Sequence, residues 1–578
     1  MNPKTIRYLS LILAAGIIGF GLSFGFLFGP GWDANGRSDS VWLLCMLVTG
    51  LLLLLAFWYG NAPIKKDASS QERIAHNTQR AMTFILAGFI LLSFQLLRNQ
   101  IVITDEISKP YFTPKNELVQ DPRIIRQQLT VQRGTVRDTF GNPLVSIEVK
   151  DGVVRRTYLN PYISPLVGYY SPLQFGSSGL EASYDDYLSG RSGTNPFVAL
   201  TRDLTHQPIV GNDLYLSIVP EYQELAQQQL GTQDGAIVLM DAKSGEILAM
   251  VGNPHFDPAQ LAFDPTVADD LWDAQTREIQ KRWNALRDDP KKPLLTRPTQ
   301  GLYIPGSTFK TVSLSTLLDL GKANPDTLWK DEGKLTVDGA VFNDPNRPDK
   351  TRTDWTTTEG YMFSLNAVFG QIGLAIGGAD ELRYMERFGF NTAIPFDIPV
   401  EKSRPFLTTG FLDKRPAQAS TGFGQGEILV TPLHWAMLAA SFARDDGALP
   451  KPILVKEIRT REKALVKATK PEVWLKPLLP ETSKTVRDIM IKSATNGYVG
   501  LNGGGLQGSG AVVGGKTGTA EVNPQQGINN GWYIAWATKG DRAFSIAVVI
   551  DNKRGAEGLT DAMPKANTIL KRVLSQVK

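Results

Sequence analysis

Ser307 and Lys310 stand three residues apart in a stretch that reads Pro-Gly-Ser-Thr-Phe-Lys from Pro305 onward. Pro305 and Gly306 bend the chain, and the apolar spacing after them predicts a helix whose first turn carries Ser307. Side chains at i and i+3 share one face of a helix, so the Lys310 amine can reach the Ser307 hydroxyl. This pair predicts a serine nucleophile that is activated by an amine.

Lys310 can act as a base only after it has lost its proton. The ordinary pKa of a lysine is about 10.4, and burial together with a neighbouring cation lowers that pKa by several units. The amino terminus of the helix would also direct backbone N–H groups at the place where an acyl oxyanion forms. Both residue types are common, so the pair gains meaning only together with further motifs.

Two further motifs follow along the chain. Ser364-Leu365-Asn366 lies within the run Glu359 to Ile376, which is predicted to be helical. Lys516-Thr517-Gly518-Thr519 follows the strand-like run Val512 to Gly515. A peptide that ends in a free carboxylate needs a cation and a hydroxyl beside its scissile bond, and the Lys-Thr pair supplies both. Gly518 has no Cβ and would let that strand lie close to the substrate.

The segment Gly510 to Thr517 also fits the phosphate-binding pattern Gly-x4-Gly-Lys-Thr. A phosphate-binding loop needs a helix directly after its threonine, because the helix N–H groups hold the phosphate. Residues Gly518 to Pro524 favour a strand or a turn instead, so we expect no nucleotide at this site. The net charge of +4 over 578 residues is also too small to indicate nucleic-acid binding.

A hydrolase with a Ser-His-Asp triad would also use an activated serine. None of the four histidines stands beside a Gly-x-Ser-x-Gly turn, so we expect surface or packed histidines at His76, His206, His255 and His434. Adjacent acidic side chains point apart, so exposed surface rather than a metal site is expected at Asp185-Asp186, Asp269-Asp270 and Asp288-Asp289. Neither a metal nor a cofactor is predicted.

Three apolar runs open the chain, at residues 8–29, 41–59 and 81–97. The first two are long enough to cross a bilayer, and the third is at the short limit. A cleavable signal peptide would produce one such run, so we predict three transmembrane helices. The only cysteine, Cys45, lies in the second of them, which excludes an intrachain disulfide and a cysteine nucleophile in the rest of the chain.

Basic residues set the predicted orientation of these helices. Residues 1–80 hold seven Lys and Arg against four Asp and Glu, and most of the cations flank the amino terminus or fill the second loop. The first loop, Pro30 to Ser40, carries only Arg37 beside two aspartates. The amino terminus and the second loop are therefore predicted to be cytoplasmic, and everything after Arg98 is predicted to lie outside the cytoplasm.

The rest of the chain alternates between strand-like and helix-like segments. Gly235 to Val251 and Trp532 to Ile550 each predict a β-hairpin, and residues 562–577 predict a final helix. A helix-rich middle separates the two hairpins, so we predict one antiparallel sheet with helices on its faces, an α+β fold. The polar segment Asp264 to Lys292 is predicted to be a loop or helix near the mouth of the site.

Ser-x-x-Lys, Ser-x-Asn and Lys-Thr-Gly in this order are typical of penicillin-binding proteins and serine β-lactamases. From Gln128 to Ile550 the chain resembles a class B penicillin-binding protein, a membrane-anchored DD-transpeptidase of peptidoglycan synthesis. Segments that resemble the family elsewhere are the pedestal motifs Arg133 to Asp138 and Gly179-Leu180-Glu181, the stretch Phe423 to Leu433, and Gly168-Tyr169-Tyr170-Ser171, which is similar to the short actinobacterial-type enzymes. The family usually has one transmembrane anchor, and Thr139 stands where it often has an arginine.

The resemblance implies a role for each residue of the three motifs. Ser307 would be the nucleophile and Lys310 its base. Ser364 would relay a proton to the leaving amine, and Asn366 would hold both Lys310 and the substrate amide. Lys516 would bind the terminal carboxylate of the substrate.

The residues around Lys516 would complete the substrate site. The resemblance implies that Thr517 binds the same carboxylate, that Gly518 lies along the substrate, and that Ser307 and Thr519 contribute backbone N–H groups to the oxyanion hole. The serine would be acylated by a D-Ala-D-Ala stem peptide with release of D-Ala, and the acyl group would pass to an amine of a neighbouring stem. β-Lactams would label the same serine.

The implied organisation is a membrane region at residues 1–98, a β-rich pedestal with its linker at 99–228, and a transpeptidase domain at 229–578 with an α/β/α sandwich. The implied partners are peptidoglycan stem peptides, β-lactam antibiotics and a glycan polymerase of the SEDS family in the membrane. The implied location is the bacterial cell membrane, with several crossings and the catalytic domain outside the cytoplasm.

Two other functions remain open for the same motifs: a β-lactam receptor or inactive cell-wall scaffold, and a serine β-lactamase. A scaffold has no physical need for an intact set of Ser307, Lys310, Ser364, Asn366 and Lys516. A β-lactamase must deacylate with a positioned water, whereas a pedestal and three membrane spans suit an enzyme fixed at the wall. A catalytic transpeptidase is therefore the expected function.

Overall fold

The computed structural model describes residues 3–27, 37–58, 67–99, 111–112, 118–119, 129–193, 208–268, 271–344 and 347–577. The contacts divide the chain into two units, Met1–Gln127 and Gln128–Lys578. Several predictions fall outside the described residues: the ends of two predicted spans at residues 28–29 and 59, Lys65 and Lys66 of the second loop, most of the predicted linker, His206, and Asp269-Asp270.

The first unit contains the helices α1 (Pro3–Leu27), α2 (Arg37–Trp58) and α3 (Ser70–Leu97). In the part of the chain that the structure describes, α3 is the one helix long and apolar enough to cross a membrane. The apolar stretches of the other two, Thr5–Gly21 and Val41–Ala56, are shorter. Each predicted span thus falls on a helix, while three crossings stay a prediction.

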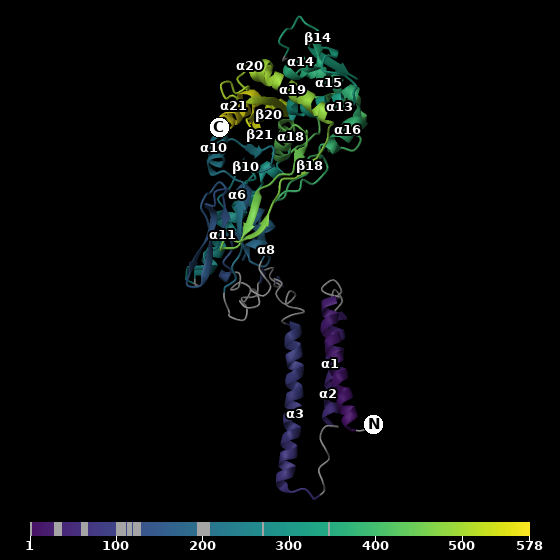
Figure 1. Ribbon diagram of the computed structural model, residues 1–578, viewed down its shortest axis with the longest axis vertical. Helices are drawn as coiled ribbons and strands as arrows, with labels where there is room; N and C mark the ends of the chain where they lie inside the picture. The colour runs from purple at the N-terminus through teal and green to yellow at the C-terminus, as the bar shows by residue number, and fades with distance from the viewer. Residues whose placement is uncertain are drawn as a thin grey trace. The chain divides into compact units, whose positions relative to one another are not determined.

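The second unit is built on a five-stranded antiparallel sheet with the order β10-β9-β21-β20-β19. Three of these strands, β10, β20 and β21, are labelled in Figure 1. Its strands are β9 (Gly235–Asp241), β10 (Ile247–Asn253), β19 (Val512–Asn523), β20 (Ile528–Lys539) and β21 (Arg542–Arg554). The two predicted hairpins are β9 with β10 and β20 with β21. Strand β21 joins them side by side, with Val548 opposite Ile237.

Helices cover both faces of this sheet because successive side chains of its strands belong to two different apolar cores. Ile237 and Leu239 pack in one core with residues of α10 (Pro220–Leu230) and α21 (Met563–Ser575). Val238 lies in the other core with α18 (Pro432–Ala443), whose residues are all buried. The predicted α+β arrangement, an antiparallel sheet flanked by helices, is confirmed.

A second sheet of six strands has the order β17-β16-β8-β3-β4-β5, and only its β3–β8 pair is parallel. Its strands are β3 (Val136–Arg137), β4 (Pro143–Lys150), β5 (Val153–Tyr158), β8 (Asp213–Leu216), β16 (Val455–Arg459) and β17 (Leu465–Ala468). Two of these strands come from the carboxyl-terminal half of the chain. The sheet therefore joins residues from both sides of position 229, where a domain boundary stays a prediction.

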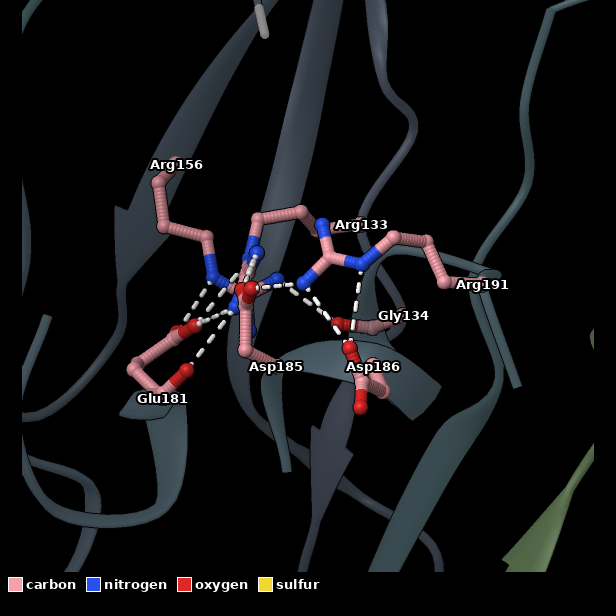
Figure 2. Close-up of polar contacts among 7 residues, drawn as sticks. All are labelled: Arg133, Gly134, Arg156, Glu181, Asp185, Asp186 and Arg191. Carbon is pink, nitrogen blue, oxygen red and sulfur yellow. Dashed lines mark hydrogen bonds and ion pairs between the residues drawn. The ribbon is translucent and has the colours of Figure 1, made fainter. Parts of the chain in front are cut away.

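A buried charge cluster holds the pedestal segments together (Figure 2). The Glu181 carboxylate, which is fully buried, accepts hydrogen bonds from Arg133 Nη2 at 2.8 Å and from Arg156 Nε at 2.6 Å. Arg133 also pairs with Asp185, whose side chain is 31% exposed. Asp185 is thus partly exposed at the edge of this cluster, and the side chain of its neighbour Asp186 is 67% exposed.

Helix α11 (Trp272–Asp288) occupies most of the segment that was predicted to lie near the site mouth. Its Trp283 stacks on Phe175 of the pedestal at 4.5 Å between ring centroids. Gln174 Nε2 donates a hydrogen bond to Thr276 O at 2.9 Å. The prediction of a helix is confirmed, but its predicted place near the site mouth is wrong, because these contacts place the helix on the pedestal.

Candidate active site

Ser307 lies in a tight 3₁₀ turn, Gly306–Phe309, that runs directly into helix α13 (Lys310–Asp319). The first turn of the predicted helix is therefore narrower than an α-helical turn. Thr308 fastens this turn to the core, because its Oγ1 donates to Pro305 O at 2.7 Å and accepts from Trp435 Nε1 at 2.7 Å. Ser307 is thus held in place while its own side chain stays half-buried.

Lys310 is fully buried beneath this turn. Its Nζ donates to the backbone oxygen of Ser364 at 2.7 Å and to Asn366 Oδ1 at 2.7 Å. Among the described residues, the hydrogen bonds of Lys310 Nζ go to the second motif and none goes to Ser307. Burial lowers the pKa of Lys310 to about 7, and the nearby Asp344 carboxylate opposes that shift. In a large share of the molecules the Lys310 amine is therefore neutral near pH 7, as a base requires.

Ser364 lies at a break between helices α14 (Thr357–Met362) and α15 (Asn366–Ile376). The single helical run predicted from residue 359 to 376 is therefore wrong at this point. Ser364 has φ +61°, a left-handed conformation that is unfavourable for residues with a Cβ and is often found at functional sites. The break turns the hydroxyl towards both lysines, with Lys516 Nζ at 2.8 Å and Lys310 Nζ at 3.3 Å from Ser364 Oγ.

Lys516 and Thr517 lie in the middle of β19, which is an edge strand of the five-stranded sheet. The strand continues to Asn523, so the helix that a phosphate-binding loop needs after Thr517 is not formed. Burial and the neighbouring Lys310 charge both lower the pKa of Lys516. Two lysines with lowered pKa values therefore meet at one serine hydroxyl.

Gly518 brings β19 against the nucleophile turn. A Cβ at this position would lie 2.8 Å from Pro305 O and 3.0 Å from Thr308 Cγ2, which is closer than such atoms approach. The Ser307 turn therefore requires a residue without a side chain at position 518. The predicted closeness of this strand to the substrate is a second reason for glycine at this position. Gly306 faces Thr519 in the same way, since its Cβ would lie 2.6 Å from Thr519 O.

A pocket of about 470 Å³ opens over these groups. Of the predicted residues, it is lined by Ser307, Ser364, Asn366, Thr517, Gly518 and Thr519, while Lys310 and Lys516 lie buried beneath it. Sequence analysis missed further lining residues: Phe342, Asn343, Gln425, Tyr498, Glu521 and Glu557. These come from separate segments without a recognisable local pattern, although Gln425 lies in the noted stretch that begins at Phe423.

No described histidine is among the residues that line this pocket. His434 is buried, and its ring nitrogens bond to Ser403 Oγ at 2.7 Å and to Phe388 O at 2.8 Å. Burial lowers its pKa to about 4, so the ring is neutral at physiological pH. His434 is a packed histidine, as predicted, and the described histidines form no triad with Ser307.

Comparison with known proteins places this geometry in a family. Residues 235–572 match the penicillin binding protein transpeptidase domain. The peptidoglycan D,D-transpeptidase PbpA of Mycolicibacterium smegmatis is 29% identical over 489 residues, which cover 82% of this chain and 93% of that protein. PbpA of Mycobacterium tuberculosis H37Rv is 27% identical over 498 residues, covering 83% of this chain and 94% of that protein.

Solved structures show the same fold. The D,D-transpeptidase domain of a peptidoglycan glycosyltransferase from Eggerthella lenta superposes with a TM-score of 0.64 at 28% identity, covering 77% of this chain and 99% of that chain. A ceftriaxone acyl-enzyme complex of penicillin-binding protein A from M. tuberculosis superposes with a TM-score of 0.69 at 24% identity. The superposition covers 77% of this chain and 99% of that chain. With the domain match over more than half of its length, this chain belongs to the penicillin-binding protein transpeptidase family.

Proposed function

We propose that Ser307 is the acylated nucleophile of this peptidoglycan D,D-transpeptidase. Ser307 Oγ attacks the carbonyl carbon between the last two D-Ala residues of a stem peptide, the terminal D-Ala leaves, and an amine of a neighbouring stem takes the acyl group. The observation that carries the proposal is the convergence of Lys310 and Lys516 on Ser364 Oγ, at 3.3 and 2.8 Å, beneath the pocket that Ser307 lines.

Lys310 is the general base in this proposal. Its amine is neutral in a large share of molecules near pH 7, because burial lowers its pKa to about 7. After it takes the proton of Ser307, the new ammonium group is stabilised by Ser364 O and Asn366 Oδ1, each at 2.7 Å. Hydrogen bonds of a catalytic pair often shorten only when substrate is bound, so the direct Ser307–Lys310 contact belongs to that state.

Ser364 passes a proton to the leaving amine. Its hydroxyl accepts from Lys516 Nζ and is free to donate towards the pocket that it lines. Burial and the Lys310 charge lower the pKa of Lys516, so its ammonium group gives up a proton to this hydroxyl more readily than an exposed lysine would. The same cation, together with the Thr517 hydroxyl, would attract the free carboxylate of the stem peptide.

The oxyanion hole would be formed by backbone N–H groups of Ser307 and Thr519. Close packing of Gly306 on Thr519 O and of Gly518 on Pro305 O supports this assignment, because it fixes the nucleophile turn against β19. β19 is an edge strand, so its unpaired side offers backbone groups along which an extended peptide can add as a further strand.

The test is covalent labelling by a fluorescent penicillin. Ser307→Ala should abolish the label and leave the thermal unfolding midpoint nearly unchanged, whereas the exposed serine variant Ser575→Ala should label like the wild type. Undiminished labelling of Ser307→Ala would refute the assignment. Rapid turnover of the label would indicate a β-lactamase, and labelling without cross-linking of a defined stem-peptide polymer would indicate a receptor.

The membrane region suggests a second part of the proposal. All three predicted spans fall on helices, and the basic second loop predicts a cytoplasmic amino terminus with the catalytic unit outside. A multi-pass anchor would suit lateral contact with a SEDS-family glycan polymerase in the same membrane. Joint purification of the two proteins in mild detergent tests this partner, and their separation under those conditions would count against it.

A further inference from the structure

Acyl transfer to an amine needs room for two peptides, and the acyl donor takes only one side of the pocket over Ser307. In the proposed reaction, the terminal carboxylate of the acyl donor lies at Thr517 and its scissile carbonyl lies beside Thr519. Glu521 is the next alternate residue of β19, and all three residues line the pocket. The acyl donor therefore extends along β19 towards Glu521. The amine has to reach the acyl group from another side.

A different wall of this pocket comes from segments outside the five-stranded sheet. Phe342 lies in strand β13 (Ala340–Asn343), and Phe423 and Gln425 follow helix α17 (Arg415–Gly422). The rings of Phe342 and Phe423 pack edge to face at 5.4 Å between their centroids. These side chains line the pocket without belonging to β19, so they form a wall that the acyl donor leaves free.

This wall packs closely against the nucleophile turn. Gly424 has φ +84°, and a Cβ at this position would lie 1.9 Å from Gly306 O, the residue before Ser307. The residues after Gly424 are therefore held in place relative to the nucleophile. Gln425 lines the pocket over Ser307, and Gly426 lines a neighbouring pocket. Adjacent residues of one segment thus face two pockets.

The neighbouring pocket has a volume of about 680 Å³, which is within the range of ligand-binding sites. Phe342 lines both pockets, so the two adjoin at this ring. Phe411 and Ala417 add further apolar surface to the second pocket. A peptide in the second pocket would therefore lie one aromatic ring away from the pocket that Ser307 lines.

Exposed charged side chains also line the second pocket: Asp338, Asp413, Lys414 and Arg415. Among the described residues, none of these four belongs to an ion pair. Lys414 interacts electrostatically with Glu427, whose carboxylate already accepts hydrogen bonds from two backbone N–H groups. Charges of both signs without ion-pair partners match a peptide that carries both an amine and a carboxylate.

We propose that the second pocket binds the acceptor stem peptide, with Arg415 and Lys414 holding its free carboxylate. The amine of the acceptor then reaches past Phe342 to the acyl group on Ser307. The inference rests on the proposed acylation of Ser307. It adds to that proposal a separate site for the second substrate.

The transfer step needs only the groups that this arrangement brings together. The neutral amine attacks the ester carbonyl, a C–N bond forms, the C–O bond to Ser307 breaks, and the proton released by the amine returns to Ser307 Oγ. Arg415 takes no part in these bond changes. Its planar guanidinium group can bind both oxygens of a carboxylate, so Arg415 is a specificity-determining residue for the acceptor.

The experiment measures how full-length protein in mild detergent divides the acyl group between an amine and water. The acyl donor is a D-Ala-D-Ala peptide whose own amine is acetylated, so that it cannot act as an acceptor. The acceptor is a short stem peptide with a free amine and a free carboxylate but no D-Ala-D-Ala end. Mass spectrometry of the products gives the ratio of cross-linked to hydrolysed peptide at each acceptor concentration.

Arg415→Gln should need a roughly tenfold higher acceptor concentration for half-maximal transfer, because a charge-assisted contact is lost. Its rate of labelling by a fluorescent penicillin should match the wild type, since labelling uses the acyl-donor side alone. The matched control is Arg282→Gln on helix α11, where the arginine side chain is 45% exposed. This control should keep the wild-type acceptor dependence. An unchanged acceptor dependence in Arg415→Gln would overturn the inference.

An acceptor whose carboxylate is amidated separates charge recognition from a change of shape. The wild type should use this amide about as poorly as Arg415→Gln uses the free acid, and Arg415→Gln should treat the acid and the amide alike. The same preference for the acid in both enzymes would overturn the inference, because the carboxylate would then be bound elsewhere. A weakened acceptor dependence in Glu521→Gln with none in Arg415→Gln would place the acceptor along β19 and would also overturn it.

The outcomes distinguish this inference from the proposed function. Wild-type protein that takes the penicillin label at Ser307 but forms no cross-linked product with either acceptor would overturn both. Cross-linking that does not depend on Arg415 would overturn the acceptor site alone and leave the proposed function standing.

Discussion

At the scale of single residues, the site works by placing two lysines where a charge is costly. Lys310 and Lys516 are buried within reach of one hydroxyl; burial lowers the pKa of both, and the Lys310 charge lowers that of Lys516 further. Burial alone would leave a neutral amine without partners. The oxygens of Ser364 and Asn366 accept hydrogen bonds from this amine, and in the proposed mechanism they would also stabilise the ammonium group formed during acylation.

The charge state of Lys310 leads to a prediction about pH. The wild-type acylation rate should fall as pH drops through about 7, because protonated Lys310 cannot take the proton of Ser307. The acylation rate of Lys310→Arg should be roughly 100-fold or more below that of the wild type at every pH, since a guanidinium group stays charged. Second-order rate constants with a fluorescent penicillin across the pH range check both statements.

A matched control for this substitution is Lys322→Arg. Lys322 lies outside the pocket and bonds Ile376 O and Asp380. This variant should keep the wild-type rate and the wild-type acid limb. A wild-type rate that is flat through neutral pH, or an active Lys310→Arg enzyme, would contradict the assignment of Lys310 as the base.

At the scale of elements, the site depends on short segments that tertiary contacts hold in unfavourable shapes. The break at Ser364 and the 3₁₀ turn at Ser307 meet the edge strand β19, where Gly518 leaves room for the turn. In the pedestal, Glu181 of helix α7 (Gly179–Ser183) ties Arg133 and Arg156 of two other segments together (Figure 2). Buried polar contacts between elements are thus used in both parts of the unit.

The Glu181 cluster leads to a prediction about stability. Glu181→Gln leaves two buried guanidinium groups without their carboxylate, so it should lower the free energy of unfolding by roughly 3 kcal/mol at neutral pH. Asp186→Asn, in the same region but with a largely exposed side chain, should change it little. Urea unfolding of both variants measures the difference, and equal effects would contradict the assigned role.

The same cluster has a defined pH dependence. Burial alone would raise the pKa of Glu181, but the Arg156 and Arg133 charges outweigh it and hold that pKa below its usual value of about 4.3. A lowered folded-state pKa means that the stabilisation is fully present above the usual value and is lost as pH falls through the folded-state pKa. The difference between wild type and Glu181→Gln should therefore shrink in acid and be constant above about pH 5.

At the scale of the whole molecule, the unit Gln128–Lys578 is held together by strands that cross the predicted domain boundary. β16 pairs with β8, and Ser217 N donates to Leu454 O at 2.8 Å beside this pairing. The amides of Leu454 and Val455 donate to Asp397, which also accepts from the hydroxyl of Tyr184 in the pedestal. Segments on the two sides of the predicted boundary therefore share backbone and side-chain bonds.

This sharing leads to a prediction about truncation. A fragment of residues 229–578 retains every proposed catalytic residue but lacks β8. Strand β16 therefore loses one of its two neighbouring strands, and apolar groups such as Val455 and Ile458 are uncovered. The fragment should unfold at a lower temperature than residues 129–578, or aggregate, and bind less fluorescent penicillin. Equal unfolding midpoints for the two fragments would show that the pedestal is dispensable for folding.

The sequence by itself predicted the proposed catalytic residues and determined the general architecture. Ser307, Lys310, Ser364, Asn366 and Lys516 were recognisable because their types and order are short-range features, and the two hairpins were recognisable because strands have a period of two. Local signals of this kind survive in the sequence because they depend on neighbouring residues alone.

Only the tertiary structure decided how these groups meet. The periodicity of residues 359–376 predicts one helix, yet contacts with Lys310 and Lys516 accompany a break at Ser364. Asp344 caps a helix from outside it, and β16 joins a sheet begun more than two hundred residues earlier along the chain. Such features depend on which distant segments become neighbours, and burial, which decides the charge of Lys310, exists only once the chain has folded.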